Sequence, residues 1–370
     1  MKLINASTRA MSPLTISVKN FSCKHRDYND TPLTEATRVL LFIIIFAIVF
    51  GNTLVLLTTW KDKRLHQPNK YFIACLAIAD LLVGLFVVPV RLHMQLNMAD
   101  VQPLSLCQFW MLVDGFCEAA SIVTLTVISV DRVFKISYPF KYRTWMDTSK
   151  SRVIIANIWL ISFVAGLFSI FTFDGSKGVI SKAYFGCRND NPVYFTVISV
   201  LFFFLPSLTI ILMYSIIFYV AYKKRKMKRK GKLGQSHAAS QNNSRGQVLM
   251  QELKTLRMLS LVVFSFILCW GPNFSLLLIS LYTPEYLSSL TQMQAAVIHN
   301  LFVVILPSIN SICNPIIYAY CDRTYNNAFK QFLRKNALAV FLSNRRHNKT
   351  GKDQRLGDCD HEGVFIPSPC

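Results

Sequence analysis

Four charged residues lie within one long apolar stretch, residues 114–133, which reads DGFCEAASIVTLTVISVDRV. Asp114 and Glu118 stand four positions apart near its start, so on a helix their carboxylates share nearly the same face. Asp131 and Arg132 stand near its end. A charge in hydrocarbon costs about 2.5–3.5 kcal/mol even on a lenient insertion scale, so charged residues inside an apolar helix indicate function. A carboxylate in a dry pocket needs a cation, which a charge-assisted hydrogen bond supplies.

The elements that must position these residues are apolar helices. Hydrophobic residue types make up 52% of the 370 residues and charged types only 16%, whereas roughly a quarter of the residues in a soluble domain are charged. The net charge of +21 is gathered in short segments between apolar runs, which favours a membrane protein over a nucleic-acid-binding one. Seven runs reach the length of roughly 20 residues that spans a bilayer. They cover about residues 39–60, 71–92, 108–133, 153–173, 193–221, 256–282 and 295–320.

Lysine and arginine in the connections between these runs predict their orientation. Basic segments follow the first, third, fifth and seventh runs, at residues 60–70, 141–143, 222–232 and 323–335. These segments lie on one side, which is therefore the cytoplasm, and the N-terminus is extracellular. Glycosylation sequons agree with this orientation and lie at Asn5, Asn20 and Asn29. No apolar core of signal-peptide length precedes the first run, so we expect that run to act as its own insertion signal.

Ten cysteines are present, and on this topology only Cys23, Cys107 and Cys187 face the oxidising side. A bridge between Cys107 and Cys187 would pin the loop before the fifth run over the mouth of the third. Cys23 has no partner that the sequence identifies. Cys359 and Cys370 in the tail could carry a lipid, but Cys370 is the last residue, so this is not a prenylation box.

Every run also carries a polar, aromatic or proline motif. In order these are GN at 51–52, LAIAD ending at Asp80, DRV at 131–133, Trp159, Pro206 followed by Tyr214, FILCWGP at 266–272 and NPIIY at 314–318. Together they resemble the rhodopsin-class G-protein-coupled receptors over about residues 38–335. The resemblance implies an all-α membrane protein, a seven-transmembrane helix bundle. The sequence after the seventh run also predicts a short amphipathic helix on the cytoplasmic membrane surface.

The resemblance divides the chain into three parts. Residues 1–37 would be an extracellular glycosylated segment, residues 38–335 the receptor domain with a third cytoplasmic loop at about 223–253, and residues 336–370 a cytoplasmic tail. The implied function is a plasma-membrane receptor, not an enzyme, that activates a heterotrimeric G protein. Further partners expected are arrestin, a receptor kinase and membrane lipid, and no nucleic acid.

Two functional clusters inside the bundle follow from the resemblance. One is a site for an allosteric sodium ion, with Asp80 as the metal ligand. This ion is the only non-protein group expected. The alternative is a polar pocket filled with water and without an ion. Its other members are Ser121, Asn310, Ser311 and Asn314. The second is an activation switch in which Arg132 pairs with Asp131 and Glu252, although Val133 replaces the usual tyrosine. Its other members are Tyr214, Phe266, Pro272, Asn314, Pro315 and Tyr318.

Asp114 coincides with the acidic position by which aminergic receptors hold the ammonium group of their ligand. We therefore expect a small cationic ligand of the biogenic-amine type. Other expected contacts are Trp110, Glu118, Phe274, Ser199, Trp270, Arg91 and Ser308. Most helix 5 serines of catecholamine receptors are missing, and Ser308 and Ile305 replace two aromatic residues of the seventh helix. The runner-up is therefore a receptor for a peptide or other non-amine ligand, or an orphan with constitutive activity.

The roles of Glu118 and Arg91 stay open at the level of sequence. The two acids could bind a dication, or Glu118 could be protonated because like charges that close raise a pKa. A third alternative is that Arg91 takes one acid and the ligand takes the other. Arg91 could also pair with Asp114 and leave no amine site. Among other classes of protein, a transporter or channel is disfavoured because no symmetric helical halves occur.

Overall fold

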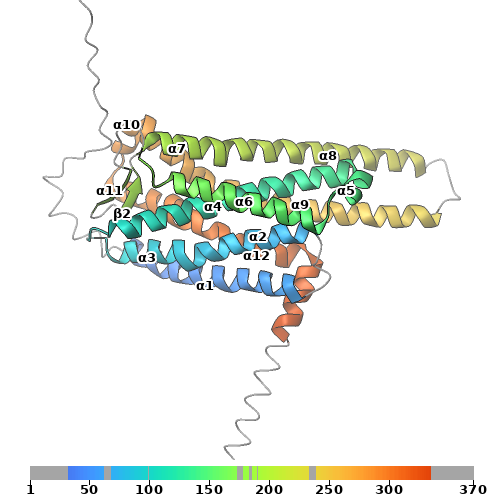
Figure 1. Ribbon diagram of the computed structural model, residues 1–370, viewed down its shortest axis with the longest axis horizontal. Coiled ribbons are helices and arrows are strands. Elements are labelled where there is room, and N and C mark those ends of the chain that lie inside the picture. Colours follow the sequence, from blue (N-terminus) through green and yellow to red (C-terminus); the bar gives the residue numbers. More distant parts are fainter. Residues whose placement is uncertain are drawn as a thin grey trace, which may run out of the picture.

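A computed structural model describes residues 32–61, 68–98, 100–172, 178–182, 186–189, 191–232 and 239–334. Within these ranges seven helical segments are long and apolar enough to cross a membrane, and they pack side by side as one bundle (Figure 1). The predicted fold class, a seven-helix membrane protein, is confirmed. Large apolar side chains such as Phe46, Ile211 and Phe264 are exposed on the outside of the bundle, where a lipid bilayer would cover them.

The seven spans are built from thirteen helical segments. The first is α1 (Pro32–Lys61), and the second consists of α2 (Pro68–Leu82), η3 (Val83–Val87) and α3 (Val88–Leu96). The third is α4 (Leu104–Ser137) and the fourth α6 (Thr148–Phe168). The fifth consists of α7 (Pro192–Ser199), η4 (Val200–Phe204) and α8 (Leu205–Lys232), the sixth is α9 (Ala239–Tyr282), and the seventh consists of α11 (Gln292–Ile298), η5 (His299–Ile305) and α12 (Leu306–Cys321).

Several helices differ in length from the apolar runs that predicted them. The fourth span ends at Phe168 rather than 173, where Ser169 caps its last turn by donating from Oγ to the Gly166 carbonyl at 2.7 Å. Helices α8 and α9 extend into the segment expected as the loop at 223–253 and project beyond the other helices (Figure 1). Residues 223–230 are lysine and arginine except for Met227, and all three types are good helix formers, so the helix continues past the apolar run.

Three π-helical segments interrupt the second, fifth and seventh spans, and each lies just before a proline. The segments η3, η4 and η5 end two residues before Pro89, Pro206 and Pro307. A proline ring clashes with the carbonyl four residues earlier, and in each case that carbonyl belongs to the π segment. The wider π turn accommodates this clash. As a result, the outer halves of these spans are rotated relative to their inner halves.

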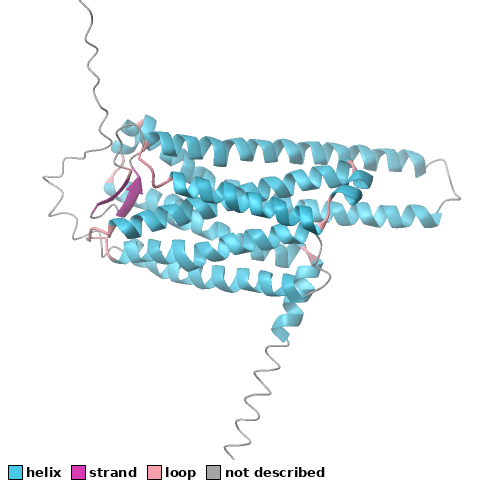
Figure 2. Ribbon diagram, in the orientation of Figure 1, coloured by secondary structure: helices cyan, strands magenta, loops and turns pink. Residues whose placement is uncertain are grey.

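A two-stranded antiparallel sheet, which the sequence did not reveal, covers the outer end of the bundle (Figure 2). Strand β1 (Val179–Lys182) pairs with β2 (Gly186–Asn189). The predicted disulfide between Cys107 and Cys187 is present and ties β2 to the start of α4. Asn189 Nδ2 donates to the Ser169 carbonyl at 2.6 Å. The sheet is thereby fastened to the third and fourth spans, above their outer ends.

Three short helices complete the described part of the chain. They are α5 (Pro139–Trp145), α10 (Pro284–Ser288) and the predicted helix after the seventh span, at residues 323–334. In this last helix Tyr325 and Phe329 are buried against the bundle, whereas Lys330 and Arg334 are exposed. This distribution confirms its amphipathic character, although Leu333 is 47% exposed.

Candidate ligand-binding site

A cavity lies between the second, third, sixth and seventh spans. Five of the predicted ligand contacts line it, and so do three of the predicted sodium-site residues. The lining consists of Val83, Val87, Arg91, Asp114, Cys117, Glu118, Ser121, Trp270, Pro307, Ser308, Asn310 and Ser311. The two sites that the sequence suggested as separate clusters therefore open into one space, with Glu118 between them along α4.

Arg91 is the best-anchored charged residue in this cavity. Its Nη1 donates to the Val304 carbonyl and to Ser308 Oγ, each at 3.1 Å. Its Nη2 lies 3.6 Å from Asp114 Oδ2, and its guanidinium carbon lies 5.6 Å from the centre of the Trp110 ring. The second span is thus connected to both the third and the seventh through one side chain. This arrangement agrees with the alternative in which Arg91 takes one of the two acids.

Glu118 differs from Asp114 in its surroundings. Its Oε1 atom is buried and has no hydrogen-bond partner within the described residues. The charged groups that act on it are Asp114 and Arg91, but its contact with Arg91 is not an ion pair within 4 Å in the described part of the chain. Buried polar atoms are usually hydrogen-bonded, so an exception of this kind needs an explanation. A bound cation or a proton would supply one.

Three predicted ligand contacts do not line this cavity. Phe274 is buried and stacks on Phe203, with ring centres 4.7 Å apart. Ser199 is fully buried on α7. Trp110 donates from its indole nitrogen to the Val87 carbonyl at 3.2 Å and contacts two lining residues, Val87 and Arg91. These residues hold the cavity walls in place.

The predicted sodium-site residues meet below the acids. Asp80 is fully buried, and its Oδ2 accepts a hydrogen bond from Asn314 Nδ2 at 2.7 Å. Asp80 Oδ1, Asn310 Oδ1 and Asn314 Oδ1 are buried oxygens with no donor in the described residues. Carboxylate and amide oxygens without donors suit a hard cation. No group of three His, Cys, Asp or Glu side chains gathers anywhere in the described ranges, so an ion here would depend on one carboxylate and neutral oxygens.

The predicted pair of Asp131 and Arg132 lies at the end of the bundle opposite the sheet. Arg132 Nη2 lies 3.6 Å from Asp131 Oδ2, and both side chains are buried. The Tyr142 hydroxyl, on α5, donates to Asp131 Oδ1 at 2.8 Å; sequence reasoning missed this residue because nothing marks it among the other tyrosines. Tyr214 is buried and lies within electrostatic range of Arg132. Glu252 lies on α9, but its side chain falls outside the described part of the structure.

Aromatic rings connect the floor of the cavity to the middle of α9. Trp270 lines the cavity, and its ring centre lies 6.3 Å from that of Phe266 and 5.9 Å from that of Phe274. Pro272 lies inside α9 and Pro315 inside α12, as predicted. Phe203 contacts both Phe266 and Phe274. A change at Trp270 is therefore passed to a packed row of rings along the sixth span.

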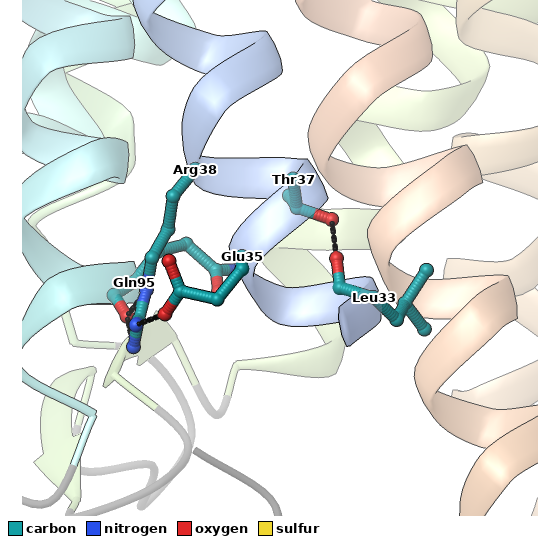
Figure 3. A network of polar contacts seen from close by, with 5 residues as sticks. All are labelled: Leu33, Glu35, Thr37, Arg38 and Gln95. Atoms are coloured by element: carbon teal, nitrogen blue, oxygen red, sulfur yellow. Dashed lines mark hydrogen bonds and ion pairs between the residues drawn. The ribbon is translucent and has the colours of Figure 1, made fainter. Parts of the chain in front are cut away.

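Two polar clusters at the ends of the bundle were not predicted. At the outer end, Arg38 donates to the Gln95 carbonyl at 2.8 and 3.1 Å and pairs with Glu35 (Figure 3). Gln95 Nε2 in turn donates to Asn300 Oδ1 at 3.3 Å. Gln95 and Asn300 each lie one helical turn outside the groups that Arg91 joins. The first, second and seventh spans are therefore held together just above the cavity.

At the inner end, Lys70 Nζ lies 2.5 Å from Asp322 Oδ2 and 4.6 Å from the centre of the Tyr325 ring. The Tyr325 hydroxyl lies 3.0 Å from Thr59 Oγ1. Burial of Asp322 disfavours its charged form, but the Lys70 ammonium and the backbone N–H groups of Thr324 and Tyr325 outweigh burial, and the pKa of Asp322 lies below its ordinary value. This cluster fastens helix 323–334 to the first two spans.

The remaining predicted sites, Asn5, Asn20, Asn29 and Cys23, lie outside the described residues, as does the tail from 335 onward. The structure therefore does not test these predictions.

The family described as "7 transmembrane receptor (rhodopsin family)" matches residues 51–318. Similar proteins include the octopamine receptor beta-2R of Chilo suppressalis, 30% identical over 80% of this chain and 79% of that receptor. The alpha-1A adrenergic receptor of Oryzias latipes is 28% identical over 94% of this chain and 77% of its own length. The trace amine-associated receptor 7d of Mus musculus is 28% identical over 87% and 90%. With seven spans, the expected motifs and this match, the chain belongs to the rhodopsin family of seven-transmembrane receptors.

Proposed function

We propose that the protein is a receptor that binds a small biogenic amine from the extracellular side and activates a heterotrimeric G protein. The observation that carries this proposal is the charge of the cavity. Asp114 and Glu118 line it together with only one cationic side chain, Arg91. An ammonium ion would balance the excess acid. The named relatives are adrenergic, octopamine and trace amine-associated receptors, which supports the same class of ligand.

Signal transfer would run from the cavity to the cytoplasmic end of the bundle. A ligand shifts an equilibrium between two conformations only by its difference in affinity for them. Trp270 lines the cavity and contacts Phe266, so a ligand that prefers one orientation of Trp270 changes the packing of α9. Movement of α9 would then alter the surroundings of the Asp131–Arg132 pair, and Arg132 would become available to the G protein.

The setting of this receptor is the plasma membrane, with the N-terminus outside. The basic segments at 141–143, 222–232 and 323–335 would then face the cytoplasm and the G protein. Arrestin and a receptor kinase are the further partners we propose, and membrane lipid would contact the exposed face of helix 323–334. Asp80, Asn310 and Asn314 would hold an allosteric sodium ion, which Ser121 and Ser311 border.

A second candidate, a receptor for a non-amine ligand, is favoured by one contact. Asp114 already has a cation in Arg91, so the position that would hold an ammonium group is partly satisfied by the protein itself. If Arg91 fully neutralised the cavity, the ligand would need no charge. The buried Glu118 oxygen argues against this, because it leaves one acid without a hydrogen bond.

The test is a concentration–response series in cells that express the full-length receptor, with a second-messenger readout for each G-protein class. The probes are octopamine, noradrenaline, phenylethylamine, histamine and 1,4-diaminobutane. Cells without the receptor and cells with the exposed-acid variant Asp100→Asn serve as controls. A saturable response to one of these amines supports the proposal. Silence toward all of them, at normal surface expression, would leave the non-amine receptor as the better assignment.

A further inference from the structure

The three charged side chains of the cavity are not equivalent. Arg91 lies on α3, whereas Asp114 and Glu118 lie one turn apart on α4, with Glu118 deeper in the bundle. Arg91 pairs with Asp114 at 3.6 Å. The Oε1 atom of Glu118 has no hydrogen-bond partner within the described residues. One acid therefore has a cation from the protein, and the deeper acid has an oxygen that nothing in the described structure satisfies.

Arg91 is held firmly in its position beside Asp114. Two hydrogen bonds from Nη1 join it to Val304 and Ser308 on the seventh span, and the Trp110 ring covers its guanidinium. An ammonium group that replaced Arg91 at Asp114 would have to break these contacts. It would also leave buried N–H groups of Arg91 without acceptors. An unsatisfied buried donor costs more free energy than a formed hydrogen bond contributes.

Glu118 offers an easier position for a ligand cation. In the described part of the chain no ion pair occupies Glu118, so an ammonium group there would replace no protein cation. Trp270 lines the same cavity, and an indole ring attracts a cation at close range. A primary ammonium carries N–H donors that satisfy the free Glu118 oxygen, which a quaternary ammonium lacks.

On the basis of the proposed function, we propose that Arg91 is the receptor's own cation for Asp114 and that the ammonium group of a small primary amine binds the Glu118 carboxylate, one helical turn deeper. Arg91 then determines specificity, because it excludes the ligand from the outer acid. Glu118 is the residue that recognises the ligand charge. The two carboxylates thus have different partners, one inside the protein and one outside it.

The experiment compares five variants of the full-length receptor with the wild type: Glu118→Gln, Asp114→Asn, Arg91→Met, the double variant Arg91→Met/Glu118→Gln, and Asp100→Asn as a control on an exposed acid. Octopamine, noradrenaline and phenylethylamine are the probes. The readouts are EC50 in cells at matched surface expression and the rise in unfolding temperature of the purified receptor caused by each amine. The second readout detects binding without signalling.

We expect Glu118→Gln to raise EC50 by about 100-fold, the effect of a lost hydrogen bond to a charged group. In the double variant Asp114 is released from Arg91 and takes over the ammonium, so EC50 returns to within about tenfold of wild type. Asp100→Asn leaves EC50 unchanged. If Glu118→Gln lowers surface expression, Glu118→Met replaces it, because an apolar residue of similar size is tolerated where a buried charge was.

Each of the other outcomes refutes a defined part of the two proposals. Loss of potency in Asp114→Asn, together with an unaffected Glu118→Gln, places the amine at Asp114 and refutes the inference while the proposed function stands. A loss in Glu118→Gln that Arg91→Met does not restore refutes the role of Arg91. Silence of every variant toward all three amines, in both readouts, refutes the inference and the proposed amine function together.

Discussion

Arg91 and Val304 join the second and seventh spans through a hydrogen bond of 3.1 Å between a guanidinium nitrogen and a backbone carbonyl. Val304 belongs to the π-helical segment η5, where regular α-helical hydrogen bonding is interrupted, so its carbonyl is available to a side chain. Arg91 follows the π segment η3 by one turn. A single side chain, one turn beyond η3, thus reaches the carbonyl of a residue in η5.

Sodium should stabilise the receptor through Asp80. We expect sodium chloride to raise the unfolding temperature of the wild type and not that of Asp80→Asn, because three buried oxygens there have no donor. At concentrations ten- to thirtyfold above Kd the gain is about 1.4–2 kcal/mol. The measurement is thermal unfolding of the purified receptor, with choline chloride at equal ionic strength and Asp100→Asn as controls. Equal shifts in wild type and Asp80→Asn would exclude an ion at Asp80.

Tyr142→Phe should raise signalling in the absence of ligand. The substitution removes the hydrogen bond from the Tyr142 hydroxyl to Asp131, and hydrogen bonds to charged groups contribute about 1.5–3 kcal/mol. Weaker restraint of Asp131 leaves Arg132 freer to exchange partners, so we expect a severalfold increase in basal second messenger at matched surface expression. The exposed Tyr286, changed to Phe, is the control. A basal signal at or below that of the wild type would show that this contact does not restrain the switch.

Gly51→Ala should disturb the contact between the first and seventh spans. A Cβ atom at Gly51 would lie 3.1 Å from both Cβ and Cγ of Pro315, whereas one at Gly271 would meet nothing nearer than Phe203 at 3.6 Å. Overpacking typically costs about 1–3 kcal/mol. We expect a lower unfolding temperature for Gly51→Ala and none of this loss for the matched helical variant Gly271→Ala. If both variants behave alike, the close approach to Pro315 does not limit the packing.

Stability of the inner cluster should depend on pH through Asp322. Because its pKa is lowered in the folded state, the stabilisation is fully present above pH about 4, the ordinary value for an aspartate, and is lost as the pH falls through the folded-state pKa. At pH 7 we expect Asp322→Asn to be less stable than the wild type by about 1–3 kcal/mol.

The difference between the two proteins should begin to shrink below pH about 4, where Asp322 of the unfolded wild type becomes protonated, and should be lost once Asp322 of the folded protein also binds a proton at its lower pKa. The measurement is unfolding temperature against pH, with Asp100→Asn as the control for loss of an acid. A difference that stays constant down to pH 3 would mean that the effect of the substitution is steric rather than electrostatic.

Much of this receptor was predictable from sequence because each membrane span is determined by the apolar composition of one contiguous stretch of the chain. Apolar length gave the seven helices, and neighbouring residues such as Asp131 and Arg132 meet wherever the helix goes. The π segments were missed because the prolines that accompany them also occur in spans without one, as Pro272 does in α9. The pair between Lys70 and Asp322 joins residues 252 positions apart, and nothing in either local sequence identifies its partner.

In the candidate site, too, the charged residues were predictable from local sequence and their contacts were not. Asp114, Glu118 and Arg91 were identified as charges inside apolar runs, but their pairing depends on how far each span is rotated. The sequence therefore left several pairings open, and the structure favours the one in which Arg91 faces Asp114. Phe274 and Ser199 were expected to contact ligand, yet their helices turn them into packed surroundings beside the cavity.

The π segment η3 also makes the cavity sensitive to the helical geometry of the second span. It lies between the inner part of the second span and α3, which carries Arg91. If η3 became α-helical at unchanged chain length, α3 would turn by about 100°, the angle of one residue in an α-helix. Arg91 would then leave Asp114 without any substitution in the lining. Two receptors of this family with identical cavity residues can therefore differ in ligand because only one of them has the π segment.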